Sequence, residues 1–410
     1  MRAIIIGASH AGAQLAASLR QDGWDGEILM IGAEPALPYH RPPLSKTYLA
    51  GKTTLNDLLI RPSEFYAKND ITVRHATVTS IDRQAHTVAL SDGEQLGYDK
   101  LALCLGARPR LLPLPGSELA GVHYLRDAAH IEAIRSGIAG AGRVVIIGAG
   151  YIGLETAASL RKLGVEVTVL ESAERVLQRV TAPEVSAFYA RVHCEEGVDI
   201  RTGVTISAIE GDDHVRGVRL ADGELVPADL VVIGIGVVPN TELAEAAGLP
   251  VDNGIVIDDH AQTSDPDIVA AGDCTNHHMP RYDRRLRLES VPSAGEQAKV
   301  AAATMCGKVK TITALPWFWS DQYELKLQIA GLNDGYDSVV LRGDPADGRS
   351  FACFYFKQGE LIAADCVDRP QEFMFSRRGI GERVAVDPSQ LADPETSLTE
   401  LLKAALSNKV

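Results

Sequence analysis

Two glycine-rich stretches of the sequence have the residue spacing of loops that bind the phosphates of a dinucleotide. The stretch 148–153 reads GAGYIG and has the complete pattern of three glycines, Gly148, Gly150 and Gly153. In such a loop the first glycine makes a tight turn, the second lets the backbone approach a pyrophosphate, and the third lets a helix pack closely on a strand. We therefore predict a dinucleotide site here, with an ordinary strand–turn–helix as the alternative.

The stretch 7–12 reads GASHAG and departs from this pattern at its middle glycine, where it has Ser9. Serine is the next smallest polar residue, so it costs some closeness of approach, while its hydroxyl can bond to a phosphate. We predict a second phosphate loop, with a loop that binds nothing as the alternative. Its residues are Gly7, Ser9, His10, Ala11 and Gly12.

A glutamate follows each loop at the distance expected for a ribose contact. Glu34 and Glu171 each end the second apolar run after their loop, where a carboxylate can accept hydrogen bonds from ribose hydroxyls. Glu171 would repel the extra 2′-phosphate of NADPH, so we favour NADH. Arg175 and Arg179 follow closely, and an arginine there could accommodate that phosphate instead.

The elements around each loop form a strand–helix–strand unit. A β-branched run precedes each loop, a helical pattern follows it, and a second strand ends at the glutamate. Towards the C-terminus, 337–343 and 350–367 read as strands, and 370–378 reads as a helix. We predict an α/β fold with two Rossmann-like dinucleotide-binding domains and a small α+β C-terminal domain. Two dinucleotides in one chain indicate electron transfer between them.

Length, charge and cysteine content exclude several classes of function. The 410 residues are more than a single hydrophobic core usually organises, so we expect more than one domain. A net charge of −14 argues against nucleic-acid binding. No apolar run has the ~18 residues that span a membrane, and the start lacks a signal-peptide pattern, so we expect a cytoplasmic protein. Six cysteines without a C-x-x-C pair predict reduced, mostly structural thiols and no metal site.

Three longer motifs carry a specific resemblance. PYHRPPLSK (38–46), RRLRLESVPSAGEQAKVAA (284–302) and PWFWSDQY (316–323) resemble the FAD-dependent NADH:ferredoxin reductases of the putidaredoxin reductase type, which serve cytochrome P450 and Rieske oxygenase systems. The resemblance implies an FAD-binding domain at 1–111 and 240–314, an NAD-binding domain at 112–239, and a C-terminal domain at 315–410.

The resemblance also implies site residues. Expected FAD contacts are Gly7, Ser9, His10, Ala11, Gly12, Glu34, Arg41, Pro42, Lys46, Val78, Gly106, Arg126, Asp273, Ser290, Val291, Ala294 and Trp319. Expected NAD contacts are Gly148, Gly150, Tyr151, Ile152, Gly153, Glu155, Glu171, Arg175, Arg179 and Gly236. For Asp273 a helix cap, and for Tyr151 and Trp319 ordinary packing, are alternatives.

Lys46 and Glu155 are the residues expected to act in the chemistry. In the family such a lysine reaches the flavin near the atom that accepts hydride, and the glutamate orients the lysine. A nearby ammonium would stabilise negative charge arriving on the ring. Both residues could instead be surface charges, which Lys and Glu usually are.

The segment after Glu34 lacks the redox-active cysteine that related disulfide reductases carry, so electrons are expected to leave the flavin directly for a [2Fe–2S] ferredoxin. The alternative acceptors are rubredoxin, a quinone or a small oxidant. A redox-sensing NADH-binding role, as in apoptosis-inducing flavoproteins, is the alternative of another class. We expect a monomer or weak homodimer. The expected docking residues are Arg281, Arg284, Arg285, Arg287, Lys299 and Trp317, although a solvated charge run would look the same.

Overall fold

The computed structural model describes residues 1–407 and divides into two compact units, which we call unit 1 and unit 2. Unit 1 comprises residues 1–41, 54–108 and 237–314. Unit 2 comprises residues 42–53, residues 109–236 and the described residues from Leu315 on.

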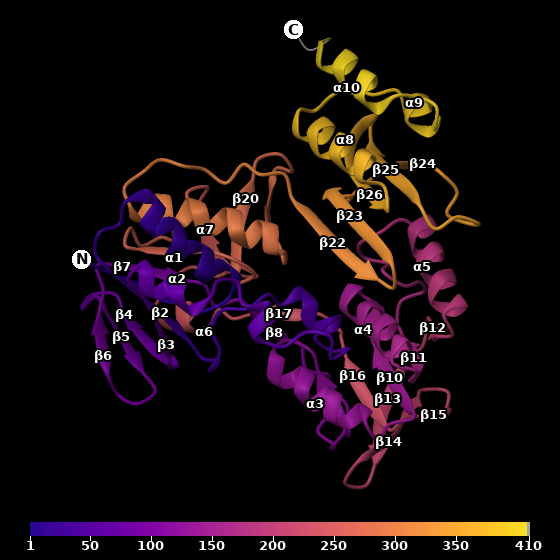
Figure 1. Cartoon of the computed structure of the whole chain (residues 1–410), viewed down its shortest axis with the longest axis horizontal. Helices are drawn as coiled ribbons and strands as arrows, with labels where there is room; N and C mark the ends of the chain where they lie inside the picture. The colour runs from indigo at the N-terminus through magenta and orange to yellow at the C-terminus, as the bar shows by residue number, and fades with distance from the viewer. Residues whose placement is uncertain (408–410) are drawn as a thin grey trace. The chain divides into compact units, whose positions relative to one another are not determined.

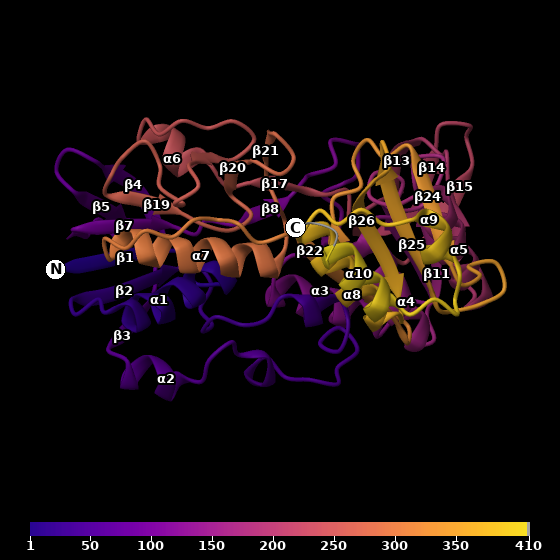
Figure 2. The ribbon, with the colours of Figure 1, turned by 90° about the horizontal axis from the view of Figure 1, so that it is seen from above.

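The central sheet of unit 1 has five parallel strands in the order β19-β7-β1-β2-β3. The strands are β1 (Arg2–Ile6), β2 (Glu27–Gly32), β3 (Ile71–His75), β7 (Lys100–Leu103) and β19 (Ile268–Ala270). Ala3 to Ile6 are all buried, as expected for a strand in the middle of a parallel sheet. Helix α1 (His10–Asp22) lies beside α7 (Val291–Met305), and both views of the ribbon show this pair against the sheet (Figures 1 and 2).

Smaller elements complete unit 1. The antiparallel strands β4 (Val78–Asp82), β5 (Thr87–Leu90) and β6 (Gln95–Gly97) form one sheet, and β18 (Ile255–Ile257), β20 (Thr275–Met279) and β21 (Arg284–Leu286) form another. Strand β8 (Ala107–Pro109) pairs with β17 (Val237–Pro239). The short helices are η2 (Asn56–Leu58), α2 (Ser63–Lys68) and α6 (Glu242–Ala246).

Unit 2 repeats the parallel arrangement, with strand order β12-β11-β10-β16-β9. The strands are β9 (Val122–Tyr124), β10 (Arg143–Ile147), β11 (Glu166–Leu170), β12 (Asp199–Arg201) and β16 (Leu230–Ile233). The helices are η1 (Pro42–Ser45), α3 (Ala128–Ile138), α4 (Tyr151–Lys162) and α5 (Pro183–Glu195). A small antiparallel sheet contains β13 (Ile206–Gly211), β14 (Val215–Leu220) and β15 (Leu225–Pro227).

The C-terminal part of unit 2 is an antiparallel sheet with helices, and it contains the strands and the helix predicted from sequence. Its strand order is β22-β23-β26-β25-β24. The strands are β22 (Trp317–Gln322), β23 (Leu325–Gly331), β24 (Ser338–Arg342), β25 (Phe351–Lys357) and β26 (Glu360–Val367). The helices are α8 (Pro370–Gly381), α9 (Pro388–Ala392) and α10 (Leu398–Ser407). The predicted fold class is confirmed.

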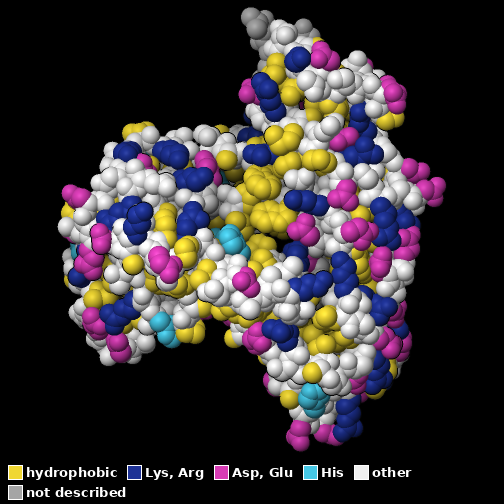
Figure 3. Space-filling view, viewed as in Figure 1, with side chains coloured by type: hydrophobic (Ala, Val, Ile, Leu, Met, Phe, Trp, Pro, Cys, Tyr) yellow, Lys and Arg dark blue, Asp and Glu magenta, His cyan; other side chains and the backbone are white. Residues whose placement is uncertain are grey.

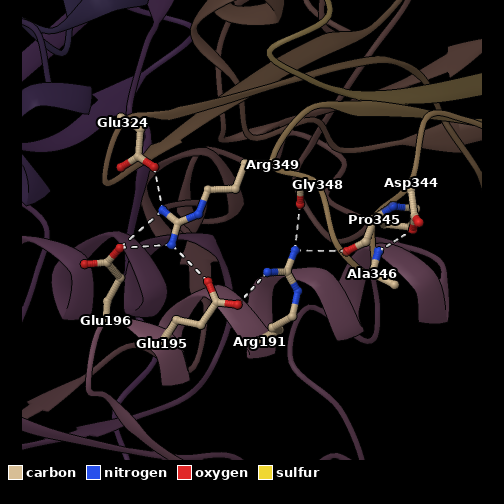
Figure 4. A network of polar contacts seen from close by, with 9 residues as sticks. All are labelled: Arg191, Glu195, Glu196, Glu324, Asp344, Pro345, Ala346, Gly348 and Arg349. Carbon is tan, nitrogen blue, oxygen red and sulfur yellow. Dashed lines mark hydrogen bonds and ion pairs between the residues drawn. The ribbon is translucent and has the colours of Figure 1, made fainter.

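An ion-pair network ties the C-terminal sheet to α5 within unit 2 (Figure 4). Arg349 donates to Glu195 at 2.9 Å and to Glu324 at 2.6 Å. Arg191 of α5 donates to the carbonyls of Pro345 at 3.1 Å and Gly348 at 2.7 Å. Each exposed pair is worth little by itself, but together they fix the loop between β24 and β25 on α5.

The expected domain boundaries differ from the two units at three places. Residues 109–111, expected in the FAD domain, are grouped with unit 2, and residues 237–239, expected in the NAD domain, are grouped with unit 1. Residues 42–53, expected in the FAD domain, are grouped with unit 2, because η1 packs against α3 and α4. The expected NAD and C-terminal domains together make unit 2, and their separation into two domains stays a prediction. Among residues 1–407 no helix is both long and apolar enough to cross a membrane.

Candidate functional site

The loop between β1 and α1 needs glycine at two of its positions. A Cβ added to Gly7, whose φ is +115°, would lie 2.0 Å from the carbonyl oxygen of Cys104. A Cβ added to Gly12 would lie 2.0 Å from the carbonyl oxygen of Gly7. Ser9 has an extended backbone at the N-terminus of α1, and its hydroxyl accepts a hydrogen bond from Arg41 Nε at 3.0 Å. Serine at this position is therefore unstrained and links the loop to the PYHRPPLSK motif.

Arg41 also connects this loop to the glutamate at the end of β2. Its guanidinium donates to Glu34, which also accepts a hydrogen bond from the Tyr39 hydroxyl. Arg41 lies over the Tyr39 ring, 5.3 Å from its centroid. The cation and the N-terminal N–H groups of α1 both favour an anion at this loop, and Glu34 retains lone pairs for ribose hydroxyls. The group thus fits the pyrophosphate and ribose of FAD.

The start of α7 lies next to the same loop. A Cβ added to Gly272 would approach the Cβ atoms of Ala11 at 3.2 Å and Ala294 at 3.8 Å. This contact brings Asp273, the next residue, beside the N-terminal turns of α1 and α7. Ser290 caps α7 and accepts a hydrogen bond from the Ser293 N–H at 3.2 Å.

Sequence reasoning missed Gln297, which holds the turn at Gly272. Its side chain is 1 % exposed, and its Oε1 accepts hydrogen bonds from the Gly272 N–H at 2.7 Å and the Thr275 hydroxyl at 2.9 Å. A glutamine within an alanine-rich helix gives no local signal of this role.

The other expected FAD contacts are divided between the units. Val78, which begins β4, and Gly106, with φ +64°, lie in unit 1, as does Val291 at the start of α7. Four others belong to unit 2, and their contact with FAD stays a prediction. These are Pro42, Lys46, Arg126 and Trp319.

The loop between β10 and α4 meets the requirements of the complete glycine pattern. A Cβ added to Gly148, whose φ is +105°, would lie 2.5 Å from the Gly234 carbonyl oxygen. A Cβ added to Gly153 would lie 2.1 Å from the Gly148 carbonyl oxygen. Around Gly150 an added Cβ would meet no described atom within 4 Å. Open space over the middle glycine is what a phosphate needs to approach the backbone, so the loop fits a dinucleotide.

Glu171 is held against this loop by backbone donors. One carboxylate oxygen accepts from the Ala149 N–H at 2.7 Å and the other from the Ala173 N–H at 2.8 Å. Two charge-assisted bonds fix the anion in place.

Arg175 is occupied within its own segment. Its guanidinium donates to the carbonyls of Thr181 at 2.8 Å and Gln178 at 3.0 Å, and to the Ser186 hydroxyl. Arg179 is exposed. Two other expected NAD contacts lie on different segments. Ile152 is 44 % exposed at the start of α4, and Gly236, with φ +100°, follows β16.

Lys46 and Glu155 form an ion pair within unit 2, in which the Lys46 side chain is 18 % exposed. Lys46 Nζ lies 2.6 Å from Glu155 Oε2, and the Glu155 side chain is 2 % exposed. The Ser45 hydroxyl donates to the same oxygen at 2.7 Å, and the Ser320 hydroxyl donates to Oε1 at 2.7 Å. The alternative of a surface charge is therefore wrong for Glu155, whereas Lys46 is partly exposed. The two serines were not found from sequence, because single serines carry no spacing signal.

Aromatic residues pack together near this pair. Tyr151 lies against Phe318, with ring centroids 5.0 Å apart, and Trp319 lies 5.6 Å from Trp317. Burial raises the pKa of Tyr151 well above its usual value, so the phenol stays protonated. The packing of Tyr151 is observed, and its contact with NAD stays a prediction.

The basic residues expected for docking are not one uniform patch. Arg284 and Arg285 are neighbours in β21 and so point to opposite faces of the strand. Arg285 donates to the carbonyls of Ile257 and Asn276 at 2.9 and 2.7 Å. Arg287, 12 % exposed, pairs with Glu289 at 2.6 Å. Lys299 on α7 is exposed, Arg281 lies just before β21, and Trp317 belongs to unit 2. Basic and acidic side chains are intermingled on the face drawn in Figure 3.

The cysteines are free thiols. Four are buried, at positions 104, 274, 353 and 366. Burial raises the pKa of Cys274 to about 11 and that of Cys104 and Cys366 well above the usual thiol value. Because the thiolate is the reactive form, burial disfavours reaction at these thiols, and their structural role stays a prediction.

Two family models together match most of the chain. The family model for pyridine nucleotide-disulphide oxidoreductases matches residues 1–298, and that for the reductase C-terminal domain matches residues 317–402. The chain is 48 % identical to putidaredoxin reductase from Pseudomonas putida, over 98 % of this chain and 97 % of that protein. It is 46 % identical to a probable ferredoxin reductase from Castellaniella defragrans, over 98 % of each.

Among solved structures, the covalent complex of putidaredoxin reductase with putidaredoxin matches with a TM-score of 0.96 at 47 % identity, covering 99 % of both chains. Both the sequence match and the structural match extend over nearly the whole chain. The chain therefore belongs to the pyridine nucleotide-disulphide oxidoreductase family and, within it, to the ferredoxin reductases, which are flavin- and NAD(P)H-dependent oxidoreductases.

Proposed function

We propose that this enzyme takes electrons from NADH through FAD and passes them singly to a [2Fe–2S] ferredoxin that supplies a cytochrome P450 or another oxygenase. The observation that carries the proposal is the presence in one chain of two glycine-rich strand-to-helix loops, each with its own carboxylate, at Glu34 and Glu171. Bound FAD would supply the conversion of a two-electron donor into one-electron steps.

In unit 1 the FAD would be held by the loop 7–12 and the residues around it. Ser9 and Arg41 would bind and orient the pyrophosphate, and Glu34 would bind the adenosine ribose. Asp273 and the N-terminal turn of α7 would hold the ribityl and flavin end. The two helix N-termini favour negative charge without any further basic residue.

Lys46 would stabilise negative charge on the reduced ring, and Glu155 would keep the ammonium in place. The support is the 2.6 Å contact and its burial, because a free lysine side chain would lose its position among many rotamers. Two serine donors hold the carboxylate from both sides.

NADH is the proposed donor rather than NADPH. The Glu171 carboxylate is fixed at the loop by two backbone N–H groups, so it cannot turn away from a 2′-phosphate without losing both. Close like charges cost several kcal/mol, which corresponds to at least tenfold in kcat/KM. Arg175 could have neutralised the 2′-phosphate, but its guanidinium already donates to the carbonyls of Thr181 and Gln178.

A ferredoxin is the proposed acceptor because the solved relative holds putidaredoxin and because the buried cysteines offer no thiol relay. The docking residues Arg281, Arg284, Arg285, Arg287, Lys299 and Trp317 remain part of the proposal. Of these, exposed Lys299 is the residue best placed to act in recognition without a structural cost.

The test is a visible spectrum of the purified holoprotein when oxidised, after NADH, and after addition of a [2Fe–2S] ferredoxin. We expect bleaching by NADH, slower bleaching by NADPH, and recovery with ferredoxin. Rubredoxin and a quinone serve as competing acceptors. Faster oxidation by either of them, or a long-lived NADH complex that no acceptor oxidises, would refute the ferredoxin reductase assignment.

A further inference from the structure

A buried row of polar side chains lies behind Glu155, on the side away from Lys46. Ser320 and Gln322 of β22 and His193 of α5 are each 0 % exposed. Buried polar groups cost free energy unless they are paired, and apolar residues of similar size would pack here without that cost. Packing alone therefore does not explain why these three positions are polar.

The four contacts of the row are continuous from the carboxylate to Tyr323. Ser320 Oγ lies 2.7 Å from Glu155 Oε1, and Gln322 Nε2 lies 3.2 Å from Ser320 Oγ. His193 Nε2 lies 2.8 Å from Gln322 Oε1, and the Tyr323 hydroxyl lies 3.1 Å from His193 Nδ1. The row thus joins α4, β22 and α5 within unit 2.

The direction of each hydrogen bond follows from the chemistry. The ionised Glu155 can only accept, so the single Ser320 hydrogen must point to it. Ser320 Oγ then accepts from the amide of Gln322, whose oxygen accepts from His193 Nε2–H. The other ring nitrogen of His193 accepts from Tyr323, because burial lowers the pKa of His193 to about 4 and keeps the ring neutral.

We infer that Ser320, Gln322 and His193 are positioning residues, which fix the Glu155 carboxylate through this one-directional chain and thereby place the Lys46 ammonium. Every donor points towards the same anion, and aligned hydrogen bonds polarise one another. Lys46 and Ser45 both bond to Oε2, so Ser320 alone donates to Oε1 among the described contacts. Without that bond the carboxylate could rotate about its terminal torsion and move the lysine with it. The inference rests on the role proposed above for Lys46.

The first test compares single-turnover reduction of the FAD-loaded enzyme by NADH among variants. We expect Ser320→Ala to lower the limiting rate about tenfold and His193→Leu about threefold. His193→Gln should restore most of the rate, because its amide can donate to Gln322. Thr156→Val is the matched control. Thr156 is buried next to Glu155 in the sequence, and its hydroxyl donates at 2.7 Å to the Ile152 carbonyl, which is not part of the hydrogen-bonded row.

A wild-type rate in folded Ser320→Ala, or equal slowing by Thr156→Val, would overturn the inference. So would equal rates in His193→Leu and His193→Gln. If Lys46→Met leaves the rate unchanged, the role proposed for Lys46 fails. The hydrogen-bonded row behind Glu155 is then tested by a second measurement that does not depend on activity.

That measurement is the imidazole ¹⁵N spectrum of His193, identified by its loss in His193→Gln. We expect the neutral Nε2–H form at neutral pH and a change in its signal when Glu155→Gln alters the far end of the chain. Three results would refute the proposed hydrogen-bonded row: the Nδ1–H form, a protonated ring at neutral pH, or a signal that Glu155→Gln does not change.

Discussion

Replacing Lys46 by methionine should separate the structural role of the buried ion pair from its chemical role. Methionine keeps the length and apolar stem of lysine but removes the charge. Glu155, 2 % exposed, then keeps two serine donors among the described residues. Removing one partner of a buried ion pair typically costs about 3–5 kcal/mol, and the remaining donors place this pair near the lower end, at about 3 kcal/mol.

The double variant Lys46→Met with Glu155→Gln should recover most of that loss, because an amide carries no charge to desolvate. Reduction of the flavin should not recover, because neither variant has the ammonium. We expect about 10- to 100-fold slower reduction in both, which corresponds to about 1.4–2.8 kcal/mol of lost transition-state stabilisation.

Urea unfolding followed by circular dichroism measures the stability, and stopped-flow loss of flavin absorbance with NADH measures the rate. Lys100→Met is the matched control, since Lys100 pairs with Asp267 at the same 2.6 Å, but the two side chains are 30 % and 32 % exposed. That pair should contribute less than about 1 kcal/mol. If the double variant regained the wild-type rate, the charge of Lys46 would not be needed. If the single variant were as stable as wild type, the pair would not be a buried one in solution.

Three further predictions concern stability and nucleotide choice. Burial raises the pKa of Asp365 to about 7. Ionisation of Asp365 in the unfolded chain therefore lowers the free energy of unfolding of the wild type as pH rises from about 4 to 7. Asp365→Asn removes this loss, so the free energy of unfolding of the variant relative to wild type should rise by up to about 4 kcal/mol between pH 4 and pH 8, measured by urea unfolding at both. Arg342 donates at 3.0 Å to the carbonyls of both Pro394 and Thr396, and pairs with Glu372 at 3.2 Å. Arg342→Met should cost about 3 kcal/mol and expose the segment before α10 to limited proteolysis. Glu171→Gln should raise the NADPH/NADH ratio of kcat/KM at least tenfold, and an unchanged ratio would show that Glu171 does not set the preference.

The sequence alone determined the elements whose causes are local. Loops 7–12 and 148–153 are recognisable because each glycine meets a steric need set by its own strand and helix, as at Gly7 and Gly153. The strands around Phe351 and the helix from Pro370 follow from residue periodicity in the same way. The family motifs added the pairing of Lys46 with Glu155, which no local pattern contains.

Only the tertiary structure decided how polar side chains far apart in the sequence meet. Ser320 is 165 residues from Glu155 and Gln322 is 129 residues from His193, yet both contacts are direct and buried. The partners of Arg175 are near in the sequence, at Gln178 and Thr181, yet its spacing after Glu171 did not reveal them either. Local preferences act through a few neighbouring residues, whereas the burial and partners of a polar group depend on which elements pack over it, and that is fixed only when the whole chain has folded.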